Sequence, residues 1–375
     1  MKIKAAVLYE QGKPRPYAQS RPLVIEELDL EGPGPGEVLV QVVGAGLCHS
    51  DLSTIDNSRP RALPTVPGHE GAGIVREVGA GVEGFAPGDH VVFVFSPSCG
   101  KCRQCRSGKP NVCSGFQGSR ARGELQTGTR RLKLGGKDIL HYSGISCFAE
   151  YAVVVPNSIV RIDKDVPLHD AAMFGCAVQT GVGAAVNTAN VRPGDVVAVV
   201  GLGGVGLSCL MGAAVAGAER IIAVDMSDEK LALARQLGAT ETYSAADADC
   251  IKSIVDATDG GVDYAFEMAG SVKAMDLAYK ITVRGGTTVS AGLPPVGGQF
   301  SVQHYAMVQD ERTVKGSYMG SCVAHRDIPR FINLYKKRKL PIDKLRSSLV
   351  TLDEINAGFD KLADAATVRQ ILVFE

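Results

Sequence analysis

The stretch Val196-Val-Ala-Val-Val200, followed at once by Gly201-Leu-Gly203-Gly204-Val205-Gly206, decides the fold of this chain. The β-branched run predicts a buried strand, and the glycines predict a tight turn that opens a helix running to about residue 217. The next apolar strand ends at Asp225, 19 residues after Gly206. Glycines and the free N–H groups of a helix N-terminus let a pyrophosphate approach the backbone. This spacing therefore predicts a dinucleotide site.

Asp225 is expected to accept hydrogen bonds from the ribose hydroxyls of that dinucleotide. Its charge also repels a 2′-phosphate, and the residues that follow it, Met226, Ser227 and Asp228, include no arginine. NAD is therefore favoured over NADP. In the alternative interpretation, the glycines form only a strand-to-helix turn and Asp225 is only a cap.

Strands and helices alternate around this stretch. Strand-like runs stand at Arg220–Asp225, Val262–Glu267 and Gly286–Gly292, and a helix is expected over Asp228–Leu237. This order predicts an α/β fold with a Rossmann-type, doubly wound parallel sheet. We assign residues 178–319 to this nucleotide-binding domain.

The rest of the chain has a different character. Residues 1–177 are rich in glycine, proline and short β-branched runs, which predicts a mostly β, barrel-like domain. The polar, glycine-studded stretch 114–144 is expected to form a long surface loop. After an amphipathic segment and a closing strand, residues 320–375 are expected to return to the first domain.

Composition excludes several classes of function. The chain has 375 residues, 45% of them hydrophobic, and its 40 basic and 40 acidic residues balance. A neutral chain has no general field for attracting nucleic acid or an anionic membrane. Apolar runs are too short for a membrane span, and the N-terminus reads as a strand and not as a secretory signal. We expect a cytoplasmic protein with a small-molecule partner.

Four cysteines are clustered within fifteen residues, at Cys99, Cys102, Cys105 and Cys113. Tetrahedral Zn²⁺ is the usual way to satisfy four thiolates at such spacing. An iron–sulfur run would place its fourth cysteine closer and follow it with proline, whereas Ser114 follows here. The pattern predicts a structural zinc lobe at about residues 97–115. Because basic residues surround the cysteines, a nucleic-acid-binding zinc ribbon is the alternative.

A second set of metal-binding residue types is dispersed. Cys48, His69 and Cys176 stand in three separate segments, Cys48-His-Ser-Asp51, Gly68-His-Glu-Gly71 and Gly175-Cys-Ala177. Spacing alone does not join them, and a lone buried cysteine is more often packing than ligand.

Taken together, these segments resemble the zinc-containing alcohol dehydrogenases of the medium-chain dehydrogenase/reductase family. The Cys48 and His69 segments, the four-cysteine lobe, Cys176 and the glycine turn occur in the same order, and the resemblance covers essentially the whole chain. It implies a GroES-like catalytic domain and an oxidoreductase that transfers a hydride from an alcohol to NAD, giving an aldehyde or ketone.

The resemblance also implies two zinc ions per chain, one structural and one catalytic. Cys48, His69 and Cys176 would hold the catalytic zinc, which polarises the alcohol as a Lewis acid. Asp51 would fix the tautomer of His69, and Glu70 would approach the metal when its fourth ligand exchanges.

Ser50 matches the hydroxyl that takes the alcohol proton. The relay histidine that many relatives have three residues later is Ser53 here. The terminal base is therefore undefined, and bulk water is the candidate.

Positions that match cofactor contacts in the family are His49, Thr180, Gly201, Gly203, Gly204, Val205, Gly206, Asp225, Lys230, Leu293 and Arg369. Those that match the substrate channel are Phe95, Tyr142, Leu293 and Tyr318. An apolar, aromatic channel favours medium-chain or aromatic primary alcohols over sugars.

Three other functions compete with this one. The glutathione-dependent formaldehyde dehydrogenases share the fold, but the position of their glutathione-binding arginine is Gln117 here, and the loop 58–67 carries Arg59 and Arg61 with no acid. Arg120 and Arg122 could compensate. Polyol dehydrogenases often lack the four-cysteine lobe. A non-enzymatic, nucleic-acid-binding zinc ribbon would predict an incomplete catalytic ligand set, whereas Cys48, His69 and Cys176 are all present. The neutral chain also lacks the excess of basic residues that nucleic-acid binding needs.

The family forms dimers and tetramers, so we expect a homodimer or homotetramer. We expect pairing through an exposed edge of the nucleotide-binding sheet, at residues 286–319.

Overall fold

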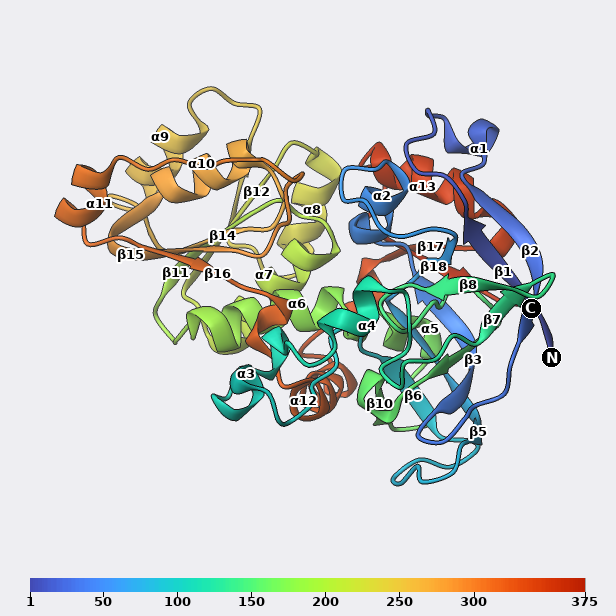
Figure 1. The fold of residues 1–375 in the computed structure, drawn as a ribbon. Helices are drawn as coiled ribbons and strands as arrows, with labels where there is room; N and C mark the ends of the chain where they lie inside the picture. The colour runs from blue at the N-terminus through green and yellow to red at the C-terminus, as the bar shows by residue number, and fades with distance from the viewer. Residues whose placement is uncertain (375) are drawn as a thin grey trace. The chain divides into compact units, whose positions relative to one another are not determined.

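The computed structural model describes residues 1–374 and divides into two compact units (Figure 1). The first unit comprises Met1–Cys176, Val323–Asn333 and Ile342 to the C-terminus, and the second comprises Ala177–Cys322 and Leu334–Pro341. The predicted domain boundaries at 177 and 319 lie near these divisions. The domain assignment itself stays a prediction.

A small closed barrel forms one part of the first unit. Its strands follow the order β1 (Lys2–Leu8), β2 (Leu23–Leu30), β7 (Leu132–Leu134), β8 (Lys137–His141) and β4 (Thr65–Val66). The expectation of a surface loop over residues 114–144 is wrong, because this stretch contains helix α4 (Gln117–Ala121) and the β7–β8 hairpin. The strands are too short to show an alternating pattern, yet Leu132 and Ile139 are buried in the core.

A second sheet of the first unit runs in the order β10 (Ile159–Ile162), β6 (His90–Phe93), β5 (Gly71–Val78), β3 (Val38–Gly46), β18 (Arg369–Val373) and β17 (Arg346–Val350), with β9 (Tyr151–Val154) also paired to β3. Strand β18 is antiparallel to β3, with Ile371 opposite Gly46. The C-terminal strand therefore lies beside the strand that leads to Cys48.

The helices that belong wholly to the first unit are short. They are α1 (Tyr17–Ser20), α2 (His49–Ile55), α3 (Arg103–Arg106), α4, α5 (Leu168–Ala171) and α13 (Ile355–Ala363). Short 3-10 segments, among them η3 (Ala172–Gly175), connect several of them to the strands. Helix α12 (Ala324–Lys336) begins in the first unit and ends in the second.

The second unit is built on a six-stranded parallel sheet. The order is β13 (Glu241–Ser244), β12 (Arg220–Asp225), β11 (Val196–Val200), β14 (Val262–Glu267), β15 (Thr282–Ser290) and β16 (Thr313–Gly316). In chain order this is 3-2-1-4-5-6, the doubly wound Rossmann order. The predicted fold class, a Rossmann sheet with a mostly β domain, is therefore confirmed.

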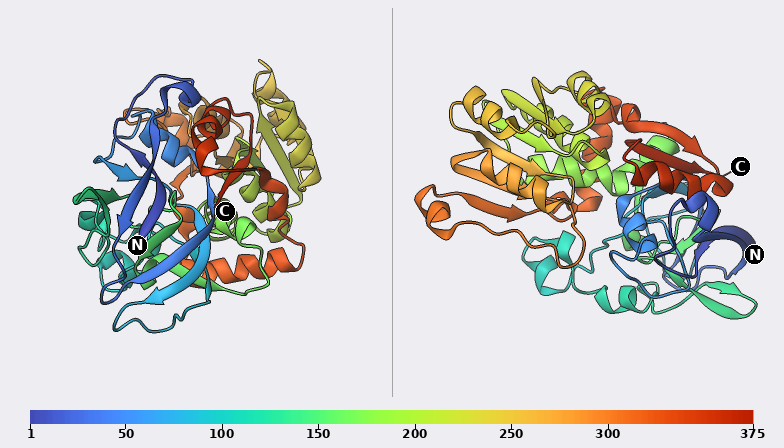
Figure 2. Two further views of the ribbon diagram at one scale, coloured as in Figure 1. Left: turned by 90° about the vertical axis from the view of Figure 1, so that its right-hand side faces the viewer. Right: turned by 90° about the horizontal axis from the view of Figure 1, so that it is seen from above.

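Helices lie on both faces of this sheet (Figure 2). They are α6 (Ala177–Gly183), α7 (Gly204–Ala216), α8 (Asp228–Gln236), α9 (Cys250–Ala257), α10 (Val272–Lys280) and α11 (His304–Gln309), with a π-helical segment over Ala184–Ala189. Buried apolar side chains such as Ile222, Val224 and Ile254 form the core between sheet and helices. Among residues 1–374, no helix is long and apolar enough to cross a membrane.

Candidate metal centres and cofactor site

Four potential ligands from three segments of the first unit meet in its interior. Cys48 lies between β3 and α2, His69 and Glu70 lie between β4 and β5, and Cys176 follows η3. The ligand atoms of these side chains all lie within 4.8 Å of one another. All four residues are buried, with at most 6% of their surface exposed. The structure thus joins the segments that spacing alone could not join.

The turn before His69 depends on glycine. Gly68 has a φ of +93°, and a Cβ atom there would stand 2.6 Å from the backbone nitrogen of Phe148. A side chain is excluded both by this close approach and by the left-handed backbone. The turn directs His69 and Glu70 into the interior.

Asp51 orients the His69 ring. Its Oδ1 lies 3.0 Å from Nδ1 of His69 and also accepts a hydrogen bond of 3.2 Å from the Gly68 N–H. Asp51 is fully buried, so solvent does not weaken the contact. When Nδ1 carries the proton that Asp51 accepts, Nε2 is left with a lone pair for a metal.

The unpartnered atoms of the cluster fit a cation. Within residues 1–374, Nε2 of His69 and both carboxylate oxygens of Glu70 are buried without a hydrogen-bond partner. Burial alone would lower the pKa of His69, but the neighbouring Asp51 carboxylate raises it well above its ordinary value. Burial raises the pKa of Glu70 to about 8. Surroundings that favour a proton on the His69 ring also favour a metal ion bound to it, and two thiols with one imidazole match a catalytic zinc set.

Arg369, at the start of β18, closes the far side of this cluster. Its Nη1 lies 3.5 Å from Oε2 of Glu70 and donates a hydrogen bond of 3.0 Å to the carbonyl of Leu47. Only 5% of its side chain is exposed. The predicted pyrophosphate-binding role is not visible in these contacts, which instead tie the arginine to Glu70.

The four-cysteine lobe has the geometry of a metal site. The four sulfur atoms lie within 4.8 Å of one another, and Sγ of Cys102 is 3.7 Å from Sγ of Cys113. A tetrahedron with Zn–S bonds of about 2.3 Å has edges of about 3.8 Å. Backbone N–H groups of Cys99 and Gly115 also donate to Sγ of Cys113, each at 3.3 Å. All four cysteines are half-exposed, in contrast to the buried cluster.

Two of the predicted channel residues flank His69. The Phe95 ring meets the His69 ring edge-on with centroids 4.8 Å apart, and the Tyr142 centroid lies 6.1 Å away. The Tyr142 hydroxyl donates to the carbonyl of Ser50 at 3.2 Å and lies 3.1 Å from the Thr54 hydroxyl. An aromatic wall therefore adjoins the buried cluster and is tied to the backbone of Ser50.

Ser53 is engaged by a neighbouring loop. Its hydroxyl donates to the carbonyl of His49 at 2.7 Å and accepts a hydrogen bond of 3.0 Å from Nη2 of Arg59. His49 itself is exposed at the first turn of α2. Arg59 thus stands beside the position that a relay histidine occupies in many relatives.

In the second unit, the glycine turn and Asp225 form one structure. A Cβ atom at Gly206 would overlap the carbonyl oxygen of Gly201, so only glycine permits this close approach of helix and strand. Oδ2 of Asp225 accepts from the N–H of Leu202 at 2.7 Å, and Oδ1 accepts from the N–H of Ser227 at 3.0 Å. These two contacts fix the carboxylate at the end of β12, beside the glycine turn, whereas the N-cap of α8 is Ser227.

The glycine turn opens α7, so Gly203, Gly204 and Val205 lie at the N-terminus of that helix. Lys230 lies in the first turn of α8, which Ser227 caps. In a doubly wound fold the N–H groups at the N-terminus of the first helix are the place where a pyrophosphate binds, so the glycine turn is in the expected position.

The remaining predicted residues of the second unit are spread over three places. Thr180 is buried in α6, and its hydroxyl lies 3.8 Å from the sulfur of Met319. Leu293 follows β15 with 52% of its surface exposed. Tyr318 is half-buried just before a 3-10 turn.

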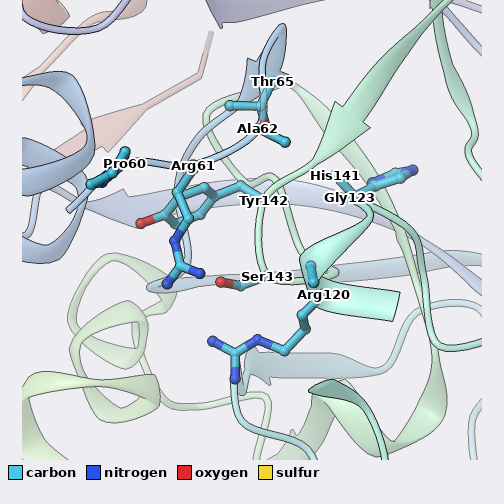
Figure 3. Close-up of a pocket in the computed structure, with 10 residues that line it drawn as sticks. Pro60, Arg61, Ala62, Thr65, Arg120, Gly123, His141, Tyr142 and Ser143 are labelled. Carbon is cyan, nitrogen blue, oxygen red and sulfur yellow. The ribbon is translucent and has the colours of Figure 1, made fainter. Parts of the chain in front are cut away.

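One pocket of the first unit was not predicted from the sequence. It has a volume of about 250 Å³, and its lining includes Arg61, Arg120 and Tyr142 (Figure 3). From the sequence, Arg120 is expected only as a substitute cation in glutathione binding. Nothing in their spacing indicates that loop 60–62 and helix α4 meet.

Comparisons with known proteins agree with this geometry. Residues 34–164 match the family model of the alcohol dehydrogenase GroES-like domain, and residues 204–337 match that of the zinc-binding dehydrogenases. The S-(hydroxymethyl)glutathione dehydrogenase of Paracoccus denitrificans is 36% identical, with all of both chains covered.

Solved structures of similar proteins extend the match. The benzyl alcohol dehydrogenase of Acinetobacter calcoaceticus is 35% identical, with a TM-score of 0.92 and all of both chains covered. A zinc-binding dehydrogenase-type protein of Sinorhizobium meliloti 1021, bound to NADP, is 27% identical with a TM-score of 0.82, again over all of both chains. The chain therefore belongs to the zinc-containing alcohol dehydrogenases of the medium-chain dehydrogenase/reductase family, oxidoreductases that use zinc and a nicotinamide dinucleotide.

Proposed function

We propose that the enzyme oxidises free primary alcohols, medium-chain or aromatic, to aldehydes with NAD as hydride acceptor. The observation that carries this proposal is the aromatic wall of Phe95 and Tyr142 against His69 in the buried cluster. Aromatic walls suit apolar alcohols, whereas sugars need buried polar partners for their hydroxyls. A screen of alcohols by NADH absorbance tests it, and turnover confined to polyols would contradict it.

In this proposal Cys48, His69 and Cys176 hold the catalytic zinc, and the four-cysteine lobe holds a structural one. A bound zinc ion supplies Lewis acidity, which lowers the pKa of an alcohol. Ser50 takes the alcohol proton. Asp51 accepts a hydrogen bond from Nδ1–H of His69 and so orients the imidazole ring. Glu70 is held near the metal ligands by its pairing with Arg369.

The last step of the proposed proton path differs from that of relatives with a relay histidine, because this position is Ser53 here. Because the Ser53 hydroxyl is bonded to His49 and Arg59, we propose that bulk water accepts the proton. His49 and Arg369 are proposed to contact the pyrophosphate when the dinucleotide binds. Thr180, Leu293 and Lys230 are proposed as further cofactor contacts, and Leu293 and Tyr318 as further parts of the channel.

NAD is the proposed cofactor, although a relative binds NADP. The fixed carboxylate of Asp225 supports this preference, because it would repel a 2′-phosphate. We expect a higher kcat/KM with NAD, and Asp225→Gly should weaken or reverse the preference. Equal use of NADP by the wild-type enzyme would refute the role given to Asp225.

Turnover is proposed to need no glutathione. One relative is an S-(hydroxymethyl)glutathione dehydrogenase and another a benzyl alcohol dehydrogenase. Gln117 supports a specificity like that of the benzyl alcohol dehydrogenase. Without a cation at this position, a glutathione carboxylate would be left unpaired in a partly dry site, which would weaken its binding by about 2–5 kcal/mol. Formaldehyde should be assayed with and without glutathione, beside benzyl alcohol and hexanol. Efficient turnover only with glutathione would assign the other specificity.

We further propose a cytoplasmic homodimer or homotetramer. Support for pairing comes from β16, which is the edge strand of its sheet and is exposed at all four residues. An unpaired edge of this kind is a site for symmetric association. Light scattering of the purified protein would measure the oligomeric state.

A further inference from the structure

A pocket in the first unit adjoins the aromatic wall of the metal cluster. Its lining comes from the 60–65 loop, helix α4 with the residues after it, and the end of β8 (Figure 3). The residues are Pro60, Arg61, Ala62, Thr65, Arg120, Ala121, Gly123, His141, Tyr142 and Ser143. None of them is acidic, so the pocket holds two cationic side chains and no anion.

The two arginines of the pocket differ from the arginines beside them in sequence. Arg59 donates to the Ser53 hydroxyl at 3.0 Å, and Arg122 pairs with Glu124 at 2.8 Å. Within residues 1–374, neither Arg61 nor Arg120 forms an ion pair, and Figure 3 shows the guanidinium groups of both near Ser143. Two unpaired cations at one pocket repel each other, and an anion between them removes that cost.

Two aromatic rings lie between the pocket and the metal cluster. Tyr142 lines the pocket, and its ring centroid is 6.1 Å from that of His69. Phe95 meets His69 at 4.8 Å, and Cζ of Arg120 lies 5.9 Å from the Phe95 centroid. A substrate with its hydroxyl at the cluster would pass these rings and bring its other end to the arginines.

The Tyr142 hydroxyl does not satisfy the arginines. It is already bonded to the Ser50 carbonyl and the Thr54 hydroxyl. The neighbouring His141 is neutral at ordinary pH, because burial lowers its pKa to about 4. A ligand must therefore supply the negative charge.

We propose that the physiological substrate is a primary alcohol that carries a carboxylate at the end remote from the hydroxyl, and that Arg61 and Arg120 bind this carboxylate. Guanidinium groups pair with carboxylates through two parallel hydrogen bonds. The pocket volume of about 250 Å³ lies below the range for drug-sized ligands, which favours one small acid over a tripeptide conjugate. The inference rests on the proposed function and specifies its substrate class.

The reaction leaves the carboxylate unchanged. The hydroxymethyl carbon loses a hydride to NAD⁺ and the hydroxyl loses a proton, so that an aldehyde acid, NADH and H⁺ are formed. The arginines act only on binding, and their removal should therefore raise KM much more than it lowers kcat.

The test compares benzyl alcohol with 4-(hydroxymethyl)benzoate, and hexanol with 6-hydroxyhexanoate, in the zinc-loaded enzyme. We expect kcat/KM at least about tenfold higher for each acid, as hydrogen bonds between charged groups allow. Arg61→Gln and Arg120→Gln should each lower kcat/KM for the acids about tenfold or more and leave the neutral alcohols almost unchanged. Arg122→Gln, whose arginine is paired with Glu124, is the matched control and should change neither.

Each other outcome overturns the proposal in a different way. Equal turnover of acids and neutral alcohols, unaffected by both variants, would refute the inference and leave the proposed function intact. Dependence on glutathione in a formaldehyde assay, with poor turnover of all four alcohols, would refute the proposed function with it. A loss of activity in Arg120→Gln that is equal for acids and neutral alcohols would indicate a structural role through Phe95.

Discussion

The two metal centres of the first unit both contain cysteine ligands but have opposite surroundings. Cys48, His69, Glu70 and Cys176 are all buried, whereas the four cysteines of the lobe are all half-exposed. The buried ligands come from three segments, and the lobe is one segment of fifteen residues. Ligands that are close in sequence can bind a stabilising metal ion before the core has formed. Ligands from separate segments come together only once the chain has folded.

Burial also separates the chemistry of the two centres. In a dry interior the interaction between charges is stronger than in water, and buried polar atoms without partners require a ligand. The buried cluster has such atoms at Nε2 of His69 and Oε1 of Glu70. In the lobe, the four sulfur atoms lie within 4.8 Å of one another, and backbone N–H groups donate to sulfur atoms of the set. The first arrangement suits catalysis and the second suits stability.

The largest effect should follow from removing a buried ligand. Cys48→Ala or Cys176→Ala should lower kcat/KM about a thousandfold or more, because Lewis acidity contributes several kcal/mol to the transition state. Circular dichroism should show that the fold is retained. A variant with more than a tenth of the wild-type activity would remove the distinction between the two centres.

Removing a lobe ligand should act on stability instead. In Cys102→Ala the free energy of unfolding should fall by several kcal/mol, because the binding energy of a structural metal is folding energy. Urea unfolding measures it, and the turnover of the folded fraction should stay within a few fold of the wild type. If this variant is as stable as Cys48→Ala, metal binding by the lobe does not stabilise the fold.

A smaller effect is expected at the carboxylate behind His69. Asp51→Asn keeps the shape but weakens the acceptor for Nδ1, so zinc affinity or activity should fall about 10–100-fold. Competition with a chelator gives the affinity directly, which a merely structural role would leave unchanged. The lobe has no such carboxylate, so the wild-type enzyme and Asp51→Asn should retain the structural zinc equally.

The smallest effect is the pH dependence of stability that comes from His141, which is buried, unlike the cysteines of the lobe. Nε2 of buried His141 accepts a hydrogen bond from the N–H of Arg131 at 3.1 Å, and burial lowers its pKa to about 4. The ordinary pKa of about 6.5 applies in the unfolded chain. A lowered pKa means that this stability is present above pH 6.5 and is lost as the pH falls toward 4.

The wild-type enzyme should therefore lose about 1 kcal/mol per pH unit relative to His141→Gln between about pH 6 and pH 4.5. Above pH 7.5 the difference should be constant. Urea unfolding at several pH values measures it, and parallel curves throughout would show that His141 is not buried as a neutral ring.

Much of this architecture could be predicted from the sequence, because its signals are local. The glycine turn after Val196–Val200 and the spacing to Asp225 predict the second unit, and the spacing of the lobe cysteines predicts a metal site. Strands β7 and β8 were missed, since each has at most five residues and they flank the glycine pair Gly135–Gly136 in a polar stretch.

The buried cluster needed more than local signals. Nothing in the spacing of Cys48, His69 and Cys176 joins β3, the β4–β5 turn and η3, and only the resemblance to a family did so. The tie between Arg369 and Glu70 depends on the pairing of β18 with β3. The arginine pocket depends on where loops meet, which periodicity does not describe.

The zinc content of single-site variants tests the distinction between the two centres most directly. Elemental analysis should find two zinc ions per chain in the wild-type enzyme, one in Cys48→Ala and one in Cys102→Ala, with turnover lost only in the first. One zinc in the wild-type enzyme, or loss of both ions from either variant, would contradict two independent centres.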